Sequence, residues 1–469
     1  MHEDESKSQK PSMRRLKTGA IQRDLAITRL SVGAGSQIAA HTLLNVFRTA
    51  SGRDAANRAF YERQARALAD QLGQLKGGVM KAGQMLSLYG QYFLPPEAVK
   101  VLSELQDSTQ PVDWAVVRPV LERQIGRERM AELQIDKDPI GAASLGQVHH
   151  ARRRSDGLEL AVKIQYPGVA AAIDSDVRTL SNIVLFTRLA PKGLSLGPVF
   201  SEVREMLHRE VDYLAERRFT QDYHRRLADD SRFIVPRVLD EYSGPEVLTT
   251  SFEKGVSVRD PSVQQLSQTR RNRLGRAMVE VFLREFFDWH QVQSDPHFGN
   301  YRFRLGAAED GSEDRIVLLD FGATRQFSLP FVQSYAKIVE GAIARDGRRV
   351  LDGATAIGLM HERFPREVLE AFVRMCELIV EPFNDHVRDG TPPQLLNAQG
   401  EYRWGPSDLP MRVGNEAGRN ALSRYFRIPP REIVFLHRRL AGVFIICSVL
   451  RAEFNARDTL LKTLAAVQG

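Results

Sequence analysis

The chain carries Ala161-Val162-Lys163-Ile164, then Asp295-Pro296-His297-Phe298-Gly299-Asn300, then Asp320-Phe321-Gly322. A lysine at the end of an apolar strand can hold nucleotide phosphates, and Asp-Phe-Gly after a strand can hold Mg²⁺. An aspartate followed five residues later by an asparagine has the spacing of a catalytic loop. Each segment alone is a weak signal. Together, in this order, they predict a site for phosphoryl transfer from ATP.

The residue types in these segments suggest individual roles. Mg²⁺ prefers hard oxygen ligands, which Asn300 and Asp320 can supply. Asp295 is the candidate catalytic carboxylate, although Gln293-Ser294 precede it where a kinase loop carries His-Arg. Lys163 needs a carboxylate to orient it. One helical segment offers three candidates, namely Glu210, Asp212 and Glu216.

The segment upstream of Lys163 differs from the Gly-rich loop that covers nucleotide phosphates in kinases. It reads Gly141-Ala142-Ala143-Ser144-Leu145-Gly146-Gln147-Val148. Alanine has less freedom at positive φ than glycine, so we expect a stiffer loop that grips ATP or ADP differently. An ordinary β-turn is the alternative. The candidate nucleotide-binding residues here are Ala142, Ala143 and Ser144.

Hydrophobic periodicity divides the chain into helical and strand-rich parts. Apolar residues at three- and four-residue steps predict an amphipathic helix over 62–88, with Lys81 and Gln84 off its apolar stripe. Further helices are predicted at 114–132, 173–189, 199–226, 331–388 and 431–467, and strands at 145–151, 158–165, 232–238 and 246–252. A hairpin is predicted over 302–320, and a Pro- and Gly-rich loop, either mobile or a surface excursion, over 389–410.

This order predicts an α+β protein with two lobes and a cleft between them. We expect a disordered tail at 1–17 and a helical extension at 18–135. A small strand-rich lobe would follow at 136–258, and a large helical lobe at 259–469.

Composition narrows the partners and the compartment. The net charge is +7 and the pI about 9.4, which fits solvated arginines or attraction to phosphates and anionic membranes. Basic residues form no block interleaved with aromatics, so nucleic acid is not expected. Two cysteines without a Cys-x-x-Cys motif argue against a disulfide framework or structural zinc. We expect a cytoplasmic protein that can sit peripherally on a membrane.

Six segments resemble the UbiB/AarF (ABC1-type) family of atypical kinases. The Gln-Tyr-Pro-Gly-Val and Gly-Ala-Thr-Arg versions are similar to its mitochondrial-type branch. The segments are Lys81-Ala82-Gly83-Gln84-Met85-Leu86-Ser87, Ala142 to Val148, Val162-Lys163-Ile164-Gln165-Tyr166-Pro167-Gly168-Val169, Glu210-Val211-Asp212-Tyr213, Ser294 to Asn300 and Leu319-Asp320-Phe321-Gly322-Ala323-Thr324-Arg325.

The resemblance implies a protein-kinase-like fold whose helical extension carries a Lys-x-Gly-Gln motif over the cleft. It places Lys81 and Gln84 at the site, with Lys81 facing the carboxylates of Glu210 and Asp212. Glu216 would then be the partner of Lys163. It also implies binding of nucleotide and Mg²⁺, ATPase activity, and a role in ubiquinone or other isoprenoid-lipid metabolism.

Two hypotheses for function follow. The first is a Mg²⁺-dependent ATPase or small-molecule kinase. The second is a non-catalytic, nucleotide-gated pseudokinase that holds a lipid intermediate or scaffolds lipid-biosynthesis enzymes. The intact Lys163, Asp295, Asn300 and Asp320 favour the first hypothesis, while the altered loop and the intruding Lys81 favour the second.

Overall fold

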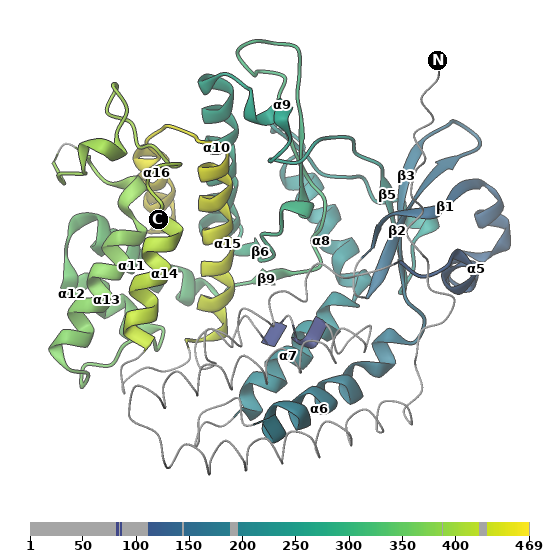
Figure 1. The fold of residues 1–469 in the computed structure, drawn as a ribbon, viewed down its shortest axis with the longest axis horizontal. Helices are drawn as coiled ribbons and strands as arrows, with labels where there is room; N and C mark the ends of the chain where they lie inside the picture. Colours follow the sequence, from purple (N-terminus) through teal and green to yellow (C-terminus); the bar gives the residue numbers. More distant parts are fainter. Residues whose placement is uncertain are drawn as a thin grey trace, which may run out of the picture. The chain divides into compact units, whose positions relative to one another are not determined.

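The computed structural model describes residues 81–83, 85–86, 111–142, 145–187, 196–386, 388–421 and 429–468. Helices and strands are mixed, which confirms the α+β class (Figure 1). The chain forms two compact units. The first comprises residues 1–217 and 237–252, and the second residues 218–236 and 253–469. The predicted tail and most of the predicted helical extension lie outside the described residues.

The first unit is built on a four-stranded antiparallel sheet. Its order is β1-β2-β3-β5, with β1 Leu133–Ala142, β2 Gly146–Arg153, β3 Glu159–Gln165 and β5 Val247–Ser251. In β3, Leu160, Val162 and Ile164 are fully buried. Because side chains alternate along a strand, Lys163 lies on the other face. The sequence did not reveal β1, because most of its side chains are exposed and its pairing is irregular around Pro139.

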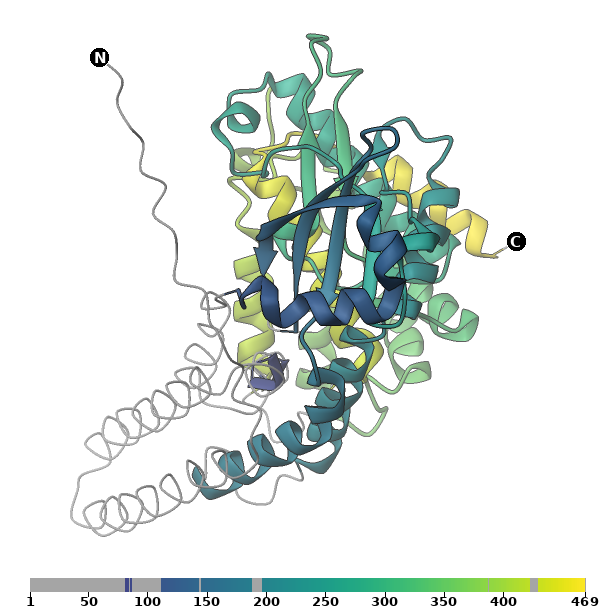
Figure 2. The same cartoon turned by 90° about the vertical axis from the view of Figure 1, so that its right-hand side faces the viewer.

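Helix α5, Trp114–Ala131, packs against this sheet and confirms the helix predicted at 114–132 (Figure 2). Val117 and Leu121 on its inner face are completely buried. The N-cap residue Asp113 accepts a hydrogen bond of 2.8 Å from the Ala115 N–H. This helix gives the exposed strand β1 a neighbour within the first unit.

The helical region predicted at 199–226 is two helices. After α6, Val169–Thr187, the chain forms α7, Gly197–Glu210, and α8, Tyr213–Arg226. The break falls at Val211-Asp212, where the carboxylate of Asp212 accepts a hydrogen bond from the Ala215 N–H and caps α8. The Gln165 amide donates to the Val211 carbonyl at 2.5 Å. A capping aspartate therefore ends the continuous helix that periodicity predicted.

The second unit is mainly helical. Its larger helices are α10 Gln268–Leu283, α11 Leu329–Ala344, α12 Gly347–Ala356, α13 Arg366–Ile379, α14 Leu409–Ala421, α15 Arg431–Val449 and α16 Arg457–Gln468. Helices α10 and α15 lie side by side (Figure 1). Its short strands are β4 Phe233–Ile234, β6 Gln291–Gln293, β7 Tyr301–Arg304, β8 Arg315–Leu318 and β9 Thr324–Gln326. They form a β4-β8-β7 sheet and a β6-β9 pair.

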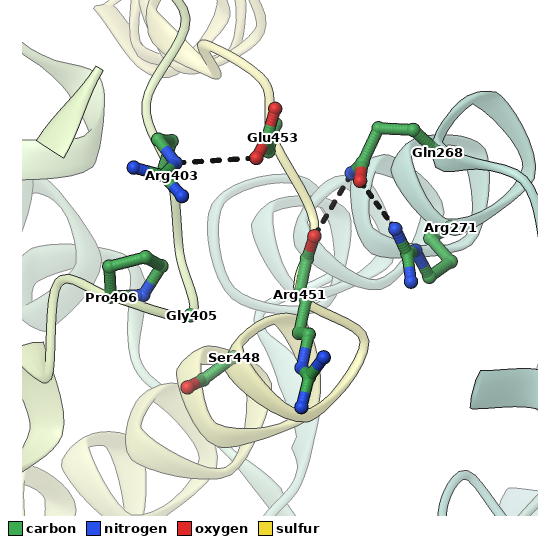
Figure 3. Close-up of a pocket in the computed structure, with 8 residues that line it drawn as sticks. All are labelled: Gln268, Arg271, Arg403, Gly405, Pro406, Ser448, Arg451 and Glu453. Carbon is green, nitrogen blue, oxygen red and sulfur yellow. Dashed lines mark hydrogen bonds and ion pairs between the residues drawn. The ribbon is translucent and has the colours of Figure 1, made fainter. Parts of the chain in front are cut away.

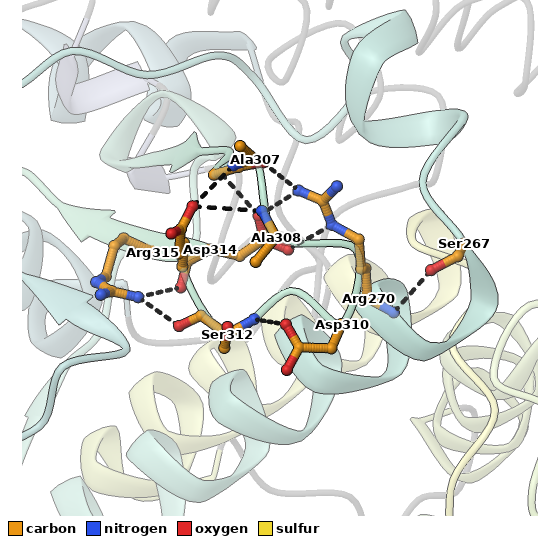
Figure 4. Close-up of polar contacts among 10 residues, drawn as sticks. Ser267, Arg270, Ala307, Ala308, Asp310, Ser312, Asp314 and Arg315 are labelled. Carbon is orange, nitrogen blue, oxygen red and sulfur yellow. Dashed lines mark hydrogen bonds and ion pairs between the residues drawn. The ribbon is translucent and has the colours of Figure 1, made fainter.

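Strands β7 and β8 confirm the predicted hairpin, and its tip is fastened to α10 (Figure 4). Arg270 donates from Nε and Nη2 to the two carboxylate oxygens of Asp314, at 2.9 and 2.5 Å. The Asp314 side chain is fully buried and also accepts from the Gly306 N–H. A bidentate pair with a backbone bond fixes the position of this loop.

The segment predicted at 389–410 as a mobile or surface loop has exposed Pro and Gly positions, but buried aromatic residues anchor it to the second unit. Tyr402 and Trp404 in this segment are fully buried, and the Trp404 indole donates to the Phe454 carbonyl at 3.2 Å. The Tyr402 hydroxyl donates to Glu381 at 2.6 Å. Aromatic anchors therefore outweigh the Pro and Gly content of this segment. Within the described residues, no helix combines the length and apolarity needed to cross a membrane.

Candidate functional site

Lys163 forms an ion pair with a buried carboxylate of the first unit. Its ammonium, Nζ, lies 2.7 and 2.8 Å from the two oxygens of Glu216. Glu216 stands in the first turn of α8, and its side chain is 4% exposed against 24% for Lys163. The ammonium also lies 5.0 Å from the centroid of the Tyr213 ring. Of the three predicted partners, Glu216 is the residue that the structure brings to Lys163.

Lys81 is paired with the end of α7. Its ammonium lies 3.0 Å from Oε1 of Glu210, and both side chains are partly exposed. Asp212, the other predicted partner, accepts the capping hydrogen bond from Ala215. The predicted cluster is thus divided: Glu210 contacts Lys81, and Asp212 holds the start of α8. Gln84 lies outside the described residues.

The altered loop connects β1 to β2. Ala142 is the exposed last residue of β1 and pairs with Gln147 of β2. Ala143 and Ser144 lie outside the described residues. Gly146, at the start of β2, is needed for packing, because a Cβ there would lie 2.6 Å from the Ile164 carbonyl oxygen. The described ends of this segment, Gly141-Ala142 and Gln147-Val148, pair with each other as antiparallel strands.

Asp295 and Asn300 contact each other in the second unit. The Asn300 amide nitrogen, Nδ2, donates to the main-chain carbonyl and to Oδ2 of Asp295, each at 3.1 Å. Oδ1 of Asp295 accepts from the Arg438 guanidinium of α15 at 2.7 Å. The five-residue spacing thus closes a compact loop around one carboxylate. Arg438 is not among the residues predicted from the sequence.

Asp320 lies next to this loop through backbone pairing. The Leu319 N–H donates to the Asn300 carbonyl at 3.0 Å, continuing the ladder between β7 and β8. Oδ1 of Asp320 accepts from the Gly322 N–H at 2.9 Å, which shapes the turn of the Asp-Phe-Gly segment. The structure therefore brings Asp295, Asn300 and Asp320 to one end of the β7–β8 hairpin.

A buried polar network supports this end of the hairpin. Arg439 donates from Nε to Glu285 at 2.9 Å and from Nη1 to the Tyr301 hydroxyl. The Tyr223 hydroxyl donates to the other oxygen of Glu285 at 3.1 Å and lies equally close to the Gln291 carbonyl. Arg439 and Glu285 are each 1% exposed. Tyr301 directly follows Asn300, so the network holds the backbone of the candidate site.

The surroundings of Tyr301 show how charge gathers here. Burial raises the pKa of the Tyr301 hydroxyl, and Arg439 opposes that rise. The negative charges of Glu285, Asp295 and Asp320 raise it further. The pKa of Glu285 is also raised by burial, against the pull of Arg439. Carboxylates thus surround a tyrosine that stays protonated.

Asn300 and Asp320 fit a hard divalent cation in chemical terms. Because the Asn300 amide nitrogen faces Asp295, its amide oxygen is the atom that can ligate a metal. No group of three or more His, Cys, Asp or Glu side chains in the described part of the chain could hold a metal unaided. An ion here would draw its other ligands from nucleotide phosphates and water, as Mg²⁺ commonly does.

A signal for Arg438 and Arg439 was present in the sequence. They interrupt an otherwise apolar helix, between Ile433–Leu436 and Ala441–Cys447. Charged residues are rarely buried unless they are paired. Two arginines in the middle of such a helix therefore indicate buried carboxylate partners, but sequence alone cannot say which.

Known proteins resemble the chain in sequence and fold. Residues 104–353 match the model of the ABC1 atypical kinase-like domain. The mitochondrial atypical kinase COQ8 of Schizosaccharomyces pombe is 30% identical over 398 residues, which are 85% of this chain and 62% of that protein. Rat mitochondrial atypical kinase COQ8B is 31% identical, over 85% of this chain and 71% of that protein.

A solved structure shares the fold. It is the Rv3197–erythromycin complex from Mycobacterium tuberculosis, with a TM-score of 0.54 and 24% identity. The similarity covers 87% of this chain and 97% of that one. The domain match spans more than half of the chain, and the sequence relatives are named as mitochondrial atypical kinases. The chain therefore belongs to the ABC1 atypical kinase-like (UbiB/AarF) family, on the branch of the mitochondrial COQ8 proteins.

Proposed function

We propose that the protein is a Mg²⁺-dependent ATPase or small-molecule kinase. The observation that carries this proposal is the convergence of Asp295, Asn300 and Asp320, which are joined by the 3.1 Å side-chain bond and the β7–β8 ladder. Three oxygen-bearing groups on adjoining backbone suit a nucleotide-bound metal and a reacting phosphoryl group. Family membership supports nucleotide binding.

The remaining predicted residues take roles around the nucleotide. Lys163, oriented by Glu216, would hold the phosphates, and Asn300 and Asp320 would hold Mg²⁺. Asp295 would orient the nucleophile. We assign Ala142, Ala143 and Ser144 to nucleotide binding. Control of access falls to Lys81, Gln84, Glu210 and Asp212.

We place the protein in isoprenoid-lipid metabolism, with the phosphate acceptor left open. The relatives named COQ8 support a role in ubiquinone or related isoprenoid-lipid metabolism. Partners would be an isoprenoid lipid and lipid-biosynthesis enzymes at a membrane surface, without nucleic acid. The net charge of +7 favours peripheral binding to an anionic membrane from the cytoplasmic side.

Arg438 supports a second candidate function, a nucleotide-gated pseudokinase. Both carboxylate oxygens of Asp295 accept hydrogen bonds, Oδ1 from Arg438 and Oδ2 from Asn300. A substrate hydroxyl that donates to Asp295 would share an oxygen that already accepts one hydrogen bond, and that bond makes the oxygen a weaker base. A protein with this arrangement could bind nucleotide and hold a lipid without turnover.

Turnover of ATP separates the two candidates. We would measure Mg²⁺-dependent ATP hydrolysis by wild type and Asp320→Asn, with and without lipid vesicles or a phenol. The neutral amide is a poor metal ligand, so turnover should fall by about 10³-fold. Exposed Asp352 on α12 offers the matched control, Asp352→Asn, which should behave as wild type.

Each result has a defined meaning. If wild type binds Mg²⁺-ATP but never hydrolyses it, the pseudokinase is correct. If folded Asp320→Asn binds nucleotide with the same Mg²⁺ dependence as wild type, the assignment of Asp320 fails.

A further inference from the structure

A polar pocket of about 340 Å³ lies in the second unit, between the start of α10 and the end of α15 (Figure 3). Its volume falls in the range of sites for small molecules. Three arginines line it with one carboxylate, so the formal charge of these four side chains is +2. The lining residues are Gln268, Arg271, Arg403, Gly405, Pro406, Ser448, Arg451 and Glu453.

Arg270 and Arg271 are neighbours on α10, but they differ in the groups that their guanidinium side chains contact. Arg270 is fully matched by the bidentate carboxylate of Asp314 (Figure 4). Within the part of the chain that the structure describes, the Arg271 guanidinium donates only to neutral acceptors, the Gln268 amide oxygen at 2.5 Å and the Gln264 carbonyl at 3.4 Å. Its buried Nε has no hydrogen-bond partner among the described residues. Arg271 is therefore held in place, and no carboxylate among the described residues pairs with its charge.

Arg403 is also held in place. Its Nε lies 3.3 Å from the carboxylate of Glu453, and its Nη1 donates to the Gln394 carbonyl at 3.3 Å. Glu453 itself accepts from the Asn397 amide. Arg403 and Asn397 thus both bind the single carboxylate of the pocket. The positive charges of Arg271 and Arg451 are not neutralised by it.

The third arginine, Arg451, has a left-handed backbone conformation, which is unfavourable for arginine. Arg451 follows α15 with φ of 48°, and its N–H donates to the Ser448 carbonyl. Glycine is the usual residue in this left-handed position, and other residues bear a cost there. Its guanidinium makes no hydrogen bond or ion pair within the described ranges. The fold therefore retains an exposed arginine at this position at a cost in backbone energy.

We propose that this pocket binds a phosphate group. A guanidinium offers a planar pair of donors that matches phosphate oxygens, and a formal charge of +2 matches a phosphate dianion. The first turn of α10 adds the positive end of a helix dipole. The pocket has room for a phosphorylated small molecule beyond the phosphate itself. A soluble phosphate ester and a phospholipid headgroup present the same group.

This pocket is separate from the candidate site described above. Arg438, which contacts Asp295, precedes Ser448 by ten residues on α15. At 1.5 Å per residue the two lie about 15 Å apart along the helix. Variants in the pocket should therefore leave nucleotide binding at Asp295 and Asp320 unchanged.

Titration calorimetry with inorganic phosphate and with glycerol 3-phosphate tests the proposal on the full chain. Arg451→Gly and Arg271→Gln should each weaken binding about tenfold or more, because each removes a charge-assisted bond. Arg451→Gly also relieves the left-handed backbone, so its Tm without ligand should equal or exceed that of wild type. Two variants should bind as wild type: Arg366→Gln, at an exposed site on α13, and Lys163→Met.

A second experiment tests whether the phosphate belongs to a soluble ester or to a lipid headgroup. Phosphatidylcholine vesicles with and without phosphatidic acid are sedimented with wild type and with Arg451→Gly. Arg451-dependent binding to phosphatidic acid without binding of the soluble probes identifies a lipid headgroup and supports the pocket. Overturning results are the absence of binding in both arms, equal binding by Arg451→Gly and wild type, or loss of binding in Lys163→Met.

Discussion

Two ion pairs with similar chemistry lie in different environments in the two units. In the first unit, Lys163 is 24% exposed and reaches a buried Glu216. In the second unit, Arg439 and Glu285 are both 1% exposed, and each contacts one tyrosine hydroxyl, Arg439 that of Tyr301 and Glu285 that of Tyr223. An ammonium in contact with water can exchange its carboxylate for a ligand. A buried guanidinium with fixed partners can only hold the structure around it.

The difference indicates where function and stability reside. The pair in the first unit joins strand β3 to helix α8, and the ammonium of Lys163 remains accessible to solvent. The pair in the second unit ties α15 to the segment after α10 and to Tyr301, beside Asn300. Removing one partner of a buried pair leaves an uncompensated charge, whereas loss of an accessible charge mainly affects what it binds. Substitutions in the two pairs should therefore affect different measurements.

The largest effect on stability is expected for Arg439→Met. This substitution leaves the Glu285 carboxylate buried without a cation, so the free energy of unfolding should fall by about 3–5 kcal/mol. Urea denaturation measures the change. The double variant Arg439→Met/Glu285→Leu removes both charges and should recover part of the loss. A single variant as stable as wild type would show that the buried pair does not hold the unit together.

Lys163→Met should affect nucleotide binding more than stability. Loss of a charged contact to phosphate should weaken nucleotide binding about 10- to 100-fold. The free energy of unfolding should fall less than in Arg439→Met, because Lys163 is partly solvated in the native state. Calorimetric titration with ATP and urea denaturation of the same sample separate the two quantities. Unfolding of this variant, or unchanged ATP affinity, would contradict the assignment.

The same contrast explains what sequence could predict. Asp295, Asn300 and Asp320 lie in short segments whose spacing follows from local structure, so their grouping was predictable. The contact of Lys163 with Glu216 spans 53 residues, and the residues alone left three candidate carboxylates, of which the family resemblance selected Glu216. The interactions of Arg438 and Arg439 with Asp295 and Glu285 span more than 140 residues, and no local pattern encodes them. Strand β1 was missed because an exposed strand shows little alternation. The loop at 389–410 was predicted without its anchors, because the partners of Tyr402 and Trp404 lie in distant segments.

The stability of the protein should depend on pH through His437 of α15. Burial lowers the pKa of His437 to about 4, and its Nε2 lies 3.0 Å from the Tyr335 hydroxyl. The unfolded chain binds a proton near pH 6.5, so the stabilisation is complete above that pH and is lost as the pH falls from 6.5 towards 4. Since the side chain is not wholly enclosed, we expect a loss of about 1–2 kcal/mol at pH 5.

Comparison with His437→Gln isolates this contribution. The variant keeps a polar group for Tyr335 but cannot titrate, so the difference between the two stability curves should change between pH 7 and pH 5. Parallel curves would mean that His437 is equally easy to protonate in the folded and unfolded chains.

The smallest effect on stability is expected for Lys81. Its pair with Glu210 is partly solvated, 22% and 29% exposed, so Lys81→Ala should change the free energy of unfolding by less than about 1 kcal/mol. If Lys81 guards the nucleotide, both Lys81→Ala and Lys81→Arg should change nucleotide handling about fivefold, because a planar guanidinium does not replace a compact ammonium. Radiolabelled ATP would also reveal any gain of phosphoryl transfer to the protein itself. Lys337→Ala, at an exposed lysine of α11, is the matched control. If the Lys81 variants handle ATP as this control does, the pair with Glu210 is only a surface contact, and the proposed control of access by Lys81 is wrong.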